Sequence, residues 1–156
     1  MSESEANVTE TENEFVIFLI GEQEYCIDIM SLREIRGWTA ATSLPDAPDY
    51  VNGVINLRGA VVPIIDLAKR LGLEPMKQTE SSVIMITTIG EQMMGLSADA
   101  VLDILSIKQD TIQAPPQMPS SGGQVFVTGL VAMKDRMISV IDLLSILPPK
   151  HKEVLA

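Results

Sequence analysis

The chain has 156 residues, of which 46% are hydrophobic, and a formal net charge of −10. This length suits one ordinary domain or two small subdomains, and the hydrophobic content is typical of a folded chain. The negative charge would repel the phosphates of nucleic acids, and aromatic residues, at 4%, offer few surfaces on which bases could stack. These properties argue against nucleic acid as a partner, and the single cysteine, Cys26, excludes a disulfide framework within the chain.

The two ends of the chain differ in composition from its middle. Residues 1–13 contain four glutamates, no basic residue and few apolar ones, which predicts an acidic disordered tail. A second tail is predicted for residues 148–156, which begin with two prolines. The chain does not open on a basic and apolar signal segment, and no eighteen apolar residues run together, so we expect a cytoplasmic protein without direct membrane insertion.

Between the tails, short apolar runs alternate with turn signals. The tetrapeptide Ile-Gly-Glu-Gln occurs twice, at 20–23 and 89–92, and each copy lies between runs rich in Val, Ile and Thr. This pattern predicts two hairpins, with strands at 15–20 and 24–29 and at 83–89 and 93–96. Each hairpin is followed by a short amphipathic segment, with apolar residues Ile29, Leu32 and Ile35 in the first copy and Val101, Ile104 and Leu105 in the second.

A longer repeat closes each half of the chain. VNGVINLRGAVVPIIDL at 51–67 aligns without a gap with VTGLVAMKDRMISVIDL at 127–143, and each predicts another hairpin. The halves, about 14–79 and 80–147, are each too small to bury much apolar surface alone, so we expect them to pack together. About five short strands per half predict a mostly β fold in which two small closed barrels share one core.

The repeat contains paired aspartates, Asp66 and Asp142, which could be catalytic or structural. Two repeat-related carboxylates can share a proton, as in bilobal aspartic hydrolases. Each aspartate, however, precedes a helical pattern, at 67–71 and 143–147, and lacks the Thr-Gly or Ser-Gly sequence that follows the aspartates of those enzymes. Aspartate before a helix is a favourable N-cap, so the capping interpretation is favoured and no catalytic residue is expected.

Few other residues indicate chemistry. No phosphate-binding glycine loop, nucleophile elbow or zinc-ligand spacing is present, so neither a cofactor nor a metal is expected. Cys26 lies in an apolar strand and is predicted to be an inert core thiol. Gly53 and Gly129 occupy equivalent repeat positions, which indicates a bulge or close backbone packing more than a ligand site. Glu34 and Arg58 lie between apolar neighbours, and each could be either a solvated surface residue or part of a binding site.

Three segments taken together resemble one known family. SLREIRG at 31–37, VNGVINLRGAVVPIIDL at 51–67 and LGL at 71–73 are similar to the CheW-like adaptor domain of bacterial chemotaxis, and the resemblance extends over about 14–147. It implies two interlocked five-stranded barrels of the SH3-like type. It also implies a scaffold without enzymatic activity, which couples transmembrane chemoreceptors to the histidine kinase CheA. The chain is too short for an added kinase or receiver domain, which favours the stand-alone coupling protein of the family.

The resemblance also implies where partners bind. Receptor tips would bind between the barrels, and the outer barrel faces would contact the CheW-like regulatory domain of CheA. We expect Glu34 and Arg58 to form a salt bridge beside the receptor groove, and we do not assign the role of Arg58 to Lys134, because the second copy departs from the motif there. The alternatives are a paralogue that serves another chemosensory array, such as one for surface motility, and an aspartyl hydrolase. The predicted receptor-binding residues are Leu32, Glu34, Ile35, Gly53, Arg58, Val101 and Ile104.

Overall fold

The computed structural model describes residues 12–116 and 126–147, which form two five-stranded sheets with short helices between strands. The predicted tail 148–156 lies outside these ranges. The strands are β1 (Glu12–Ile20), β2 (Gln23–Asp28), β3 (Leu32–Gly37), β4 (Val51–Leu57), β5 (Ala60–Asp66), β6 (Val83–Ile89), β7 (Gln92–Ala98), β8 (Ala100–Lys108), β9 (Val127–Met133) and β10 (Arg136–Ile141). The helical turns are η1 (Ile29–Ser31), α2 (Leu67–Arg70), η2 (Gln109–Thr111) and α3 (Leu143–Ile146).

The predicted hairpins and helical turns are confirmed, and one boundary is corrected. The two Ile-Gly-Glu-Gln turns join β1 to β2 and β6 to β7, with Ile20 opposite Gln23 and Ile89 opposite Gln92. Both turn glycines, Gly21 and Gly90, have positive φ. The boundary of the predicted tail 1–13 was wrong by two residues, because the chain already pairs with β8 from Glu12 onward. Residues 1–11 lie outside the described ranges.

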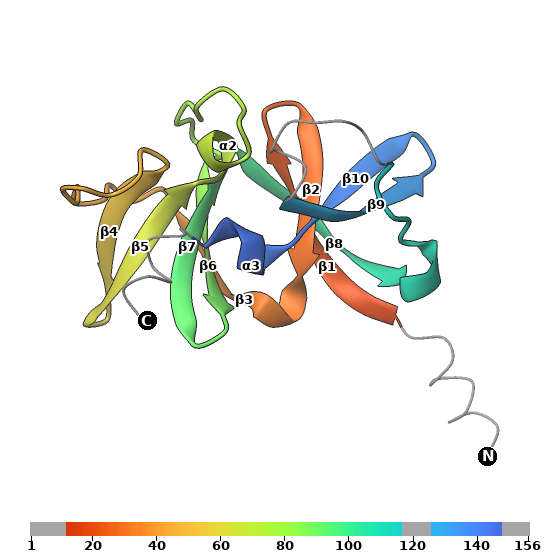
Figure 1. The fold of residues 1–156 in the computed structure, drawn as a ribbon, viewed down its shortest axis with the longest axis horizontal. Coiled ribbons are helices and arrows are strands. Elements are labelled where there is room, and N and C mark those ends of the chain that lie inside the picture. Colours follow the sequence, from red (N-terminus) through yellow and green to blue (C-terminus); the bar gives the residue numbers. More distant parts are fainter. Residues whose placement is uncertain (1–11, 117–125, 148–156) are drawn as a thin grey trace, which may run out of the picture.

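The two sheets do not correspond to the two halves of the sequence. Sheet A has the order β8-β1-β2-β10-β9 and sheet B has the order β3-β6-β7-β5-β4, so each contains strands from both halves (Figure 1). Four pairings join strands of different halves: β1 with β8 and β3 with β6 are antiparallel, and β2 with β10 and β5 with β7 are parallel. When each strand is replaced by its repeat equivalent, the order of sheet A becomes that of sheet B. The duplication therefore builds two equivalent sheets that are interlocked by exchanged strands.

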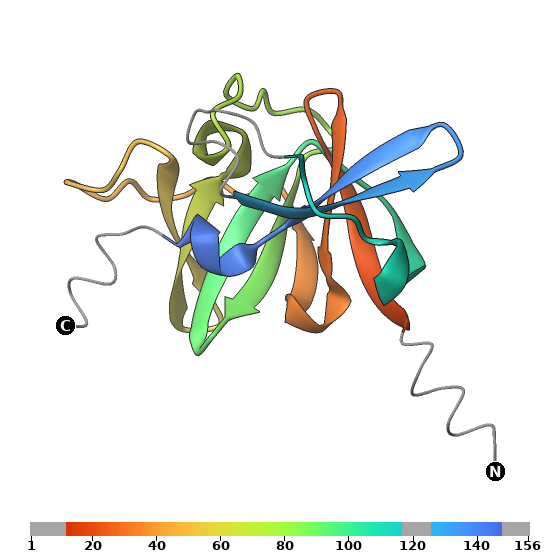
Figure 2. The ribbon, with the colours of Figure 1, turned by 45° about the vertical axis from the view of Figure 1, so that its right-hand side comes forward.

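A single isolated bridge draws the outer strands of each sheet toward one another. In sheet B, Thr42 continues from β3 and pairs with Val54 of β4, and in sheet A, Gln113 continues from β8 and pairs with Leu130 of β9. We call each sheet with its bridging segment barrel A or barrel B. In Figure 2 the β4–β5 hairpin of barrel B and the β9–β10 hairpin of barrel A extend to opposite sides of the molecule.

Strand β1 shows how two barrels share one core. Its residues alternate between two buried clusters, with Phe15 and Ile17 inside barrel A and Val16 and Phe18 in a central cluster. The central cluster also contains Met85 and other residues of sheet B, so it joins the barrels. A strand buried on both faces appears in the sequence as a continuous apolar run, as 15–20 does. Cys26 is fully buried inside barrel A, and burial raises the pKa of its thiol to about 12, which agrees with an inert core thiol.

Candidate partner-binding surfaces

A tight turn presents Arg58 at the tip of the β4–β5 hairpin. Arg58 and Gly59 form the whole connection between Leu57 and Ala60, and both have positive φ, as a type I′ turn requires. The Asn56 side chain accepts a hydrogen bond of 2.8 Å from the Gly59 backbone N–H and holds the turn. The arginine is therefore placed on a rigid hairpin, with its side chain 69% exposed.

Glu34 pairs with Arg58, as the sequence analysis predicted. Arg58 Nη2 donates to Glu34 Oε1 at 2.7 Å, and Arg36 Nη1 donates to the other carboxylate oxygen, Oε2, at 3.0 Å. The hydrogen bond from Arg58, followed by that from Arg36, lowers the pKa of Glu34 below its ordinary value. Sequence reasoning missed Arg36, although strand alternation places residues i and i+2 on one face and could have revealed it. The cluster of one carboxylate with two arginines carries a net positive charge on a chain that is acidic overall.

The four predicted apolar contact residues share one side of β3 and β8. Opposite residues of antiparallel strands point to the same side of a sheet. Ile35 lies opposite Met85, and Ile104 and Val101 lie opposite Val16 and Phe18. All three partners belong to the central cluster between the barrels. Leu32 and Val101 pack against this cluster, whereas Ile35 and Ile104 are exposed.

A bulge in each strand explains the spacing of these residues. Residues three apart in a regular strand point to opposite faces, but β3 has a register shift between Leu32 and Glu34 and β8 has one at Leu102. The extra residue places Leu32 with Ile35, and likewise Val101 with Ile104. The three-residue spacing of these apolar side chains, which suggested amphipathic segments, therefore arises from bulged strands. The ion pair of Glu34 lies on the other side of β3, because Glu34 is opposite Ile86 of the cluster inside barrel B.

Barrel A carries a counterpart of the Glu34 cluster that the sequence analysis did not identify. Asp103 occupies the β8 position equivalent to Glu34, and it lies 3.6 Å from the guanidinium of Arg136 in β10. Arg136 also forms an ion pair of 2.8 Å with Glu24 of β2, and this hydrogen-bonded pair raises the pKa of Arg136. Alignment of the two repeats could have identified Asp103 as the equivalent of Glu34. Arg136 aligns with an alanine of the first copy, so no motif indicated this arginine.

Gly53 is required by the fold of barrel B itself. It is buried at a register shift between β4 and β5 and has a φ of +143°. A Cβ atom at this position would lie 2.1 Å from the carbonyl oxygen of Thr42. The predicted bulge and close backbone packing are therefore confirmed, and the structure gives Gly53 a role in holding Thr42 against β4. Gly129 in β9 is similarly confined, because its Cβ would lie 2.4 Å from Ile112 Cγ2.

The paired aspartates cap the helical turns that follow them. Asp66 accepts from the backbone N–H of Lys69 at 3.3 Å, and Asp142 accepts from the backbone N–H of Leu144 at 3.3 Å and from the Ser145 hydroxyl at 2.7 Å. The capping interpretation is therefore confirmed. Within residues 12–116 and 126–147, no group of three or more His, Cys, Asp or Glu side chains could hold a metal ion.

Replacing either cap tests this assignment. We expect Asp66→Ala or Asp142→Ala to lower the free energy of unfolding by about 1 kcal/mol, because backbone N–H groups lose their acceptor. Asp66→Asn and Asp142→Asn are the matched controls and should change it by less, since asparagine also caps helices well. Urea unfolding followed by circular dichroism measures the difference. A hydrolytic activity in the parent protein that either alanine variant abolished would contradict the capping role.

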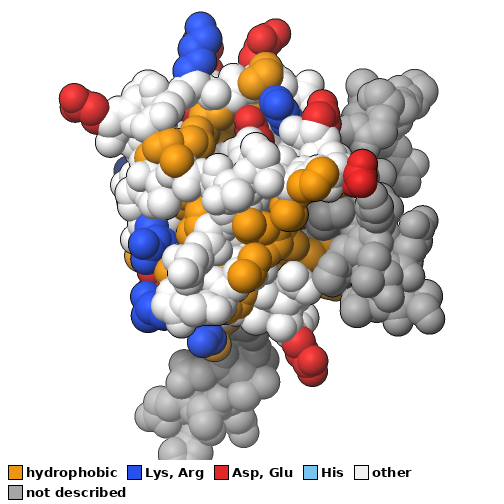
Figure 3. All heavy atoms as spheres, turned by 90° about the vertical axis from the view of Figure 1, so that its left-hand side faces the viewer, with side chains coloured by type: hydrophobic (Ala, Val, Ile, Leu, Met, Phe, Trp, Pro, Cys, Tyr) orange, Lys and Arg blue, Asp and Glu red, His pale blue; other side chains and the backbone are white. Residues whose placement is uncertain are grey.

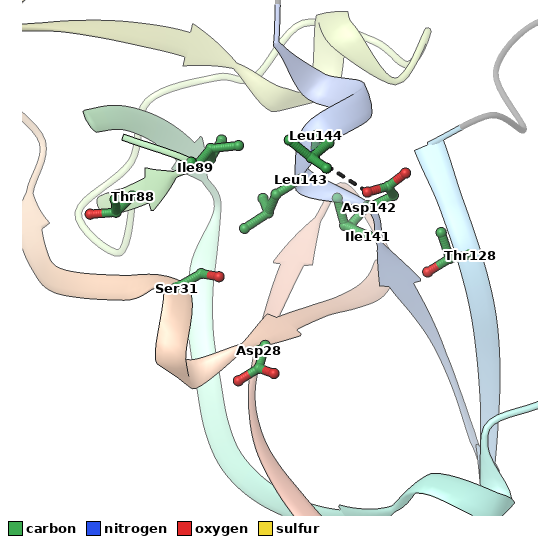
Figure 4. Close-up of a pocket in the computed structure, with 10 residues that line it drawn as sticks. Asp28, Ser31, Thr88, Ile89, Thr128, Ile141, Asp142, Leu143 and Leu144 are labelled. Atoms are coloured by element: carbon green, nitrogen blue, oxygen red, sulfur yellow. Dashed lines mark hydrogen bonds between the residues drawn. The ribbon is translucent and has the colours of Figure 1, made fainter. Parts of the chain in front are cut away.

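A cleft of about 400 Å³ lies between elements of the two barrels (Figure 4). Ser31 of η1, Thr88 at the end of β6 and Leu143 of α3 line it, and Thr128 of β9 lies at its far side. It shares no residue with the predicted receptor-binding set. Sequence reasoning missed this cleft, because its walls come from segments that only the strand exchange brings together.

No helix in the described ranges is both long enough and apolar enough to cross a membrane.

Comparison with known proteins identifies the family. The model of the CheW-like domain matches residues 14–150. A probable chemotaxis protein CheW of Rhizobium etli is 46% identical over 143 residues, which cover 92% of each chain. The chemotaxis protein CheW of Rhizobium meliloti is 42% identical over 153 residues, which cover 98% of this chain and 99% of the relative.

A solved structure agrees in fold as well as in sequence. The crystal structure of the scaffolding protein TtCheW from Thermoanaerobacter tengcongensis superimposes with a TM-score of 0.78 at 34% identity, covering 85% of this chain and 90% of that one. The interlocked sheets, the capped helical turns and the matched relatives all lead to one assignment. The chain belongs to the family of CheW-like domains and is a coupling adaptor of chemotaxis.

Proposed function

We propose that this protein is a non-enzymatic scaffold that couples the cytoplasmic tips of transmembrane chemoreceptors to the histidine kinase CheA. It would act in the cytoplasm and be recruited to receptor arrays at the membrane. The observation that carries the proposal is the Glu34–Arg58 ion pair of 2.7 Å, which joins β3 to the tip of the β4–β5 hairpin. Such a pair contributes little to stability at an exposed site, but at a partly desolvated interface it can fix the register of a partner.

The receptor would dock on the side of β3 and β8 that lies between the barrels. Leu32 and Val101 form its partly buried floor, and Ile35 and Ile104 offer exposed apolar contacts. A helical partner with apolar side chains would fit this surface, because burial of exposed apolar area favours association. Glu34 and Arg58 would then contact polar groups of the receptor at one edge.

CheA would bind the outer faces of the barrels. Val61 of β5 and Met137 of β10 occupy equivalent repeat positions, and their side chains are 72% and 59% exposed. Their neighbours Val62 and Ile138 point into the barrels, so Val61 and Met137 point outward. Figure 3 views the molecule from the side on which β4 lies in Figure 1, and it shows hydrophobic side chains gathered on that face. Between residues 38 and 66, the segment that contains β4 and β5, the exposed large apolar residues are Leu44 and Val61. Two similar faces suit a partner that carries the same kind of domain.

A charge on either outer face should weaken kinase binding. We expect Val61→Glu or Met137→Glu to lower CheA affinity about tenfold or more, because a carboxylate would be desolvated in an apolar contact. The melting temperature should change little, since both side chains are exposed. Leu144→Glu on α3, where the side chain is 62% exposed, is the matched control and should leave CheA affinity unchanged. Calorimetric titration measures all three, and equal affinity in all variants would remove these faces from the kinase site.

Reconstitution tests the function as a whole. A receptor cytoplasmic fragment and CheA are mixed with and without this protein, and kinase autophosphorylation is measured. We expect receptor-dependent change in kinase activity only when the protein is present. Kinase activity that is the same in both mixtures would refute the coupling role.

A further inference from the structure

Arg70, the last residue of α2, bonds to the end of α3. Its Nε donates to the carbonyl of Ile146 at 2.9 Å, and its Nη2 donates to the carbonyls of Ser145 and Leu147, both at 3.1 Å. The last carbonyls of a helix have no partner within the helix, and a cation at this end is favourable. Figures 1 and 2 show that α2 follows β5 of sheet B and that α3 follows β10 of sheet A. The three hydrogen bonds of Arg70 therefore connect the two barrels.

The same guanidinium lies between two aromatic rings, one from each barrel. Its Cζ atom is 4.3 Å from the ring centroid of Tyr50 and 4.8 Å from that of Phe126. These aromatic residues are repeat equivalents, since each immediately precedes a hairpin, β4 or β9. The carbonyl of Tyr50 accepts from the Asp66 backbone N–H at 2.7 Å, and that of Phe126 accepts from the Asp142 backbone N–H at 2.8 Å. Arg70 therefore contacts the start of one hairpin in each barrel.

The repeat does not by itself supply this contact. In the second copy, the position equivalent to Arg70 is Ile146, which is fully buried in the central cluster. One arginine thus serves both halves and breaks their symmetry. The apolar central cluster attaches the barrels to one another, but apolar contacts are not directional. The planar fork of Arg70, with three hydrogen bonds and two ring contacts, is directional.

We propose that Arg70 is a positioning residue that fixes the orientation of barrel A relative to barrel B. The receptor surface described above takes Leu32 and Ile35 from β3 of barrel B and Val101 and Ile104 from β8 of barrel A. Its shape therefore depends on the angle between the barrels, so Arg70 sets the fraction of molecules that are competent to bind. This last step rests on the proposed function, whereas the orientation itself does not.

Distances between spin labels test the orientation directly. Glu22, in the turn between β1 and β2 of barrel A, and Glu91, in the turn between β6 and β7 of barrel B, are exposed and occupy equivalent repeat positions, so each is replaced by cysteine and labelled. Cys26 is buried and its thiol has a raised pKa, so it should remain unlabelled. We expect double electron–electron resonance to give one narrow distance distribution in the parent. Arg70→Ala should shift or broaden it, and Arg70→Lys should have a smaller effect in the same direction, because lysine keeps the charge but not the fork.

The matched control is Lys69→Ala, which removes a positive charge from the same helix. Lys69 Nζ donates a hydrogen bond of 3.4 Å to the Asp49 carbonyl, in the same half of the chain as α2, so the distribution should stay as in the parent. If Arg70→Ala does not fold, the folded Arg70→Lys and Arg70→Gln variants decide the question. A distribution identical to that of the parent in every folded Arg70 variant would overturn the proposal.

Receptor binding provides the functional readout. If the binding-competent orientation falls to about a tenth of the population in a folded Arg70 variant, receptor affinity should fall about tenfold. Binding of CheA to each outer face should stay as in Lys69→Ala, because each face lies within one barrel. Altered distances with unchanged receptor affinity would refute the link to the receptor surface. A parent that binds no receptor fragment would instead refute the proposed function, and the distance measurement would still decide the role of Arg70.

Discussion

Replacing Gly53 by alanine is expected to lower the free energy of unfolding by about 3–5 kcal/mol, since two separate costs add at this position. The first cost is backbone strain, because a φ of +143° belongs to a region that is essentially limited to glycine. The second is a clash, because the new Cβ atom would lie 2.1 Å from the carbonyl oxygen of Thr42 and 2.6 Å from its carbonyl carbon. Both contacts are to backbone, so no side chain can rotate away.

Relief of the clash would break the bridge between Thr42 and β4. Thr42 exchanges two backbone hydrogen bonds with Val54, each of 2.8 Å, and these form the isolated bridge to β4. Moving Thr42 away from residue 53 would lengthen both bonds, at a cost of about 1 kcal/mol each. Loss of receptor binding in a Gly53 variant would therefore accompany a displaced segment around Thr42, and would not require Gly53 to touch the receptor.

Alanine variants of two other glycines separate the cost of backbone strain from the cost of the clash. Gly21 has a φ of +62° but nothing within 4 Å of an added Cβ, so Gly21→Ala should show strain alone, about 1 kcal/mol. Gly37 has neither feature, and Gly37→Ala should stay within about 0.5 kcal/mol of the parent. Urea unfolding of the three variants measures the series. A Gly53→Ala variant as stable as Gly37→Ala would contradict the assignment.

Local chemistry made much of this fold predictable. The turns at Gly21 and Gly90, the hairpin tip at Arg58 and the caps at Asp66 and Asp142 each depend on a few neighbouring residues, so the sequence carries their signal. Strand exchange is different, because β2 pairs with β10 more than a hundred residues away and no local pattern specifies that partner. The same holds for Arg70, whose contacts at Ser145 and Phe126 exist only once the exchanged strands are in place.

The candidate site shows the same division. Sequence spacing placed Leu32 with Ile35 and Val101 with Ile104, but the bulges that bring each pair to one side of its strand depend on pairing with β6 and β1. Family resemblance supplied Glu34 and Arg58, and their ion pair is present at 2.7 Å. The apolar spacing of Ile29, Leu32 and Ile35 indicates an amphipathic segment and not an alternating strand, so it gives no sign that Arg36 is the second partner of Glu34.

Replacing Arg58 by alanine should cost roughly 2–5 kcal/mol of receptor binding while lowering the free energy of unfolding by at most about 1 kcal/mol. The small effect on stability follows from exposure, because the Arg58 side chain is 69% exposed in the free protein and solvent screens its ion pair. The large effect on binding follows from desolvation, because a docked receptor would exclude water from the same charges. CheA affinity should change less, since the outer barrel faces are separate from this cluster.

Lys134→Ala is the matched control for this substitution. Lys134 occupies the equivalent hairpin tip in barrel A and has a φ of +50°, against +51° for Arg58. Alanine therefore meets the same backbone strain in both variants, and each variant loses one exposed positive charge. Receptor affinity should fall for Arg58→Ala and stay unchanged for Lys134→Ala, as measured by binding to a receptor cytoplasmic fragment.

A double-mutant cycle separates the ion pair from its two members. Glu34→Ala should also weaken receptor binding, because it removes the carboxylate that orients Arg58. The loss of receptor binding free energy in the double variant should be smaller than the sum of the losses in the two single variants, since either single substitution already breaks the ion pair. In Arg58→Ala the carboxylate still has Arg36 at 3.0 Å, so Arg36→Ala added to this variant should leave Glu34 unpaired and lower receptor affinity further. Unchanged binding in both single variants would remove these residues from the receptor site, and strictly additive losses would remove only the coupling between them.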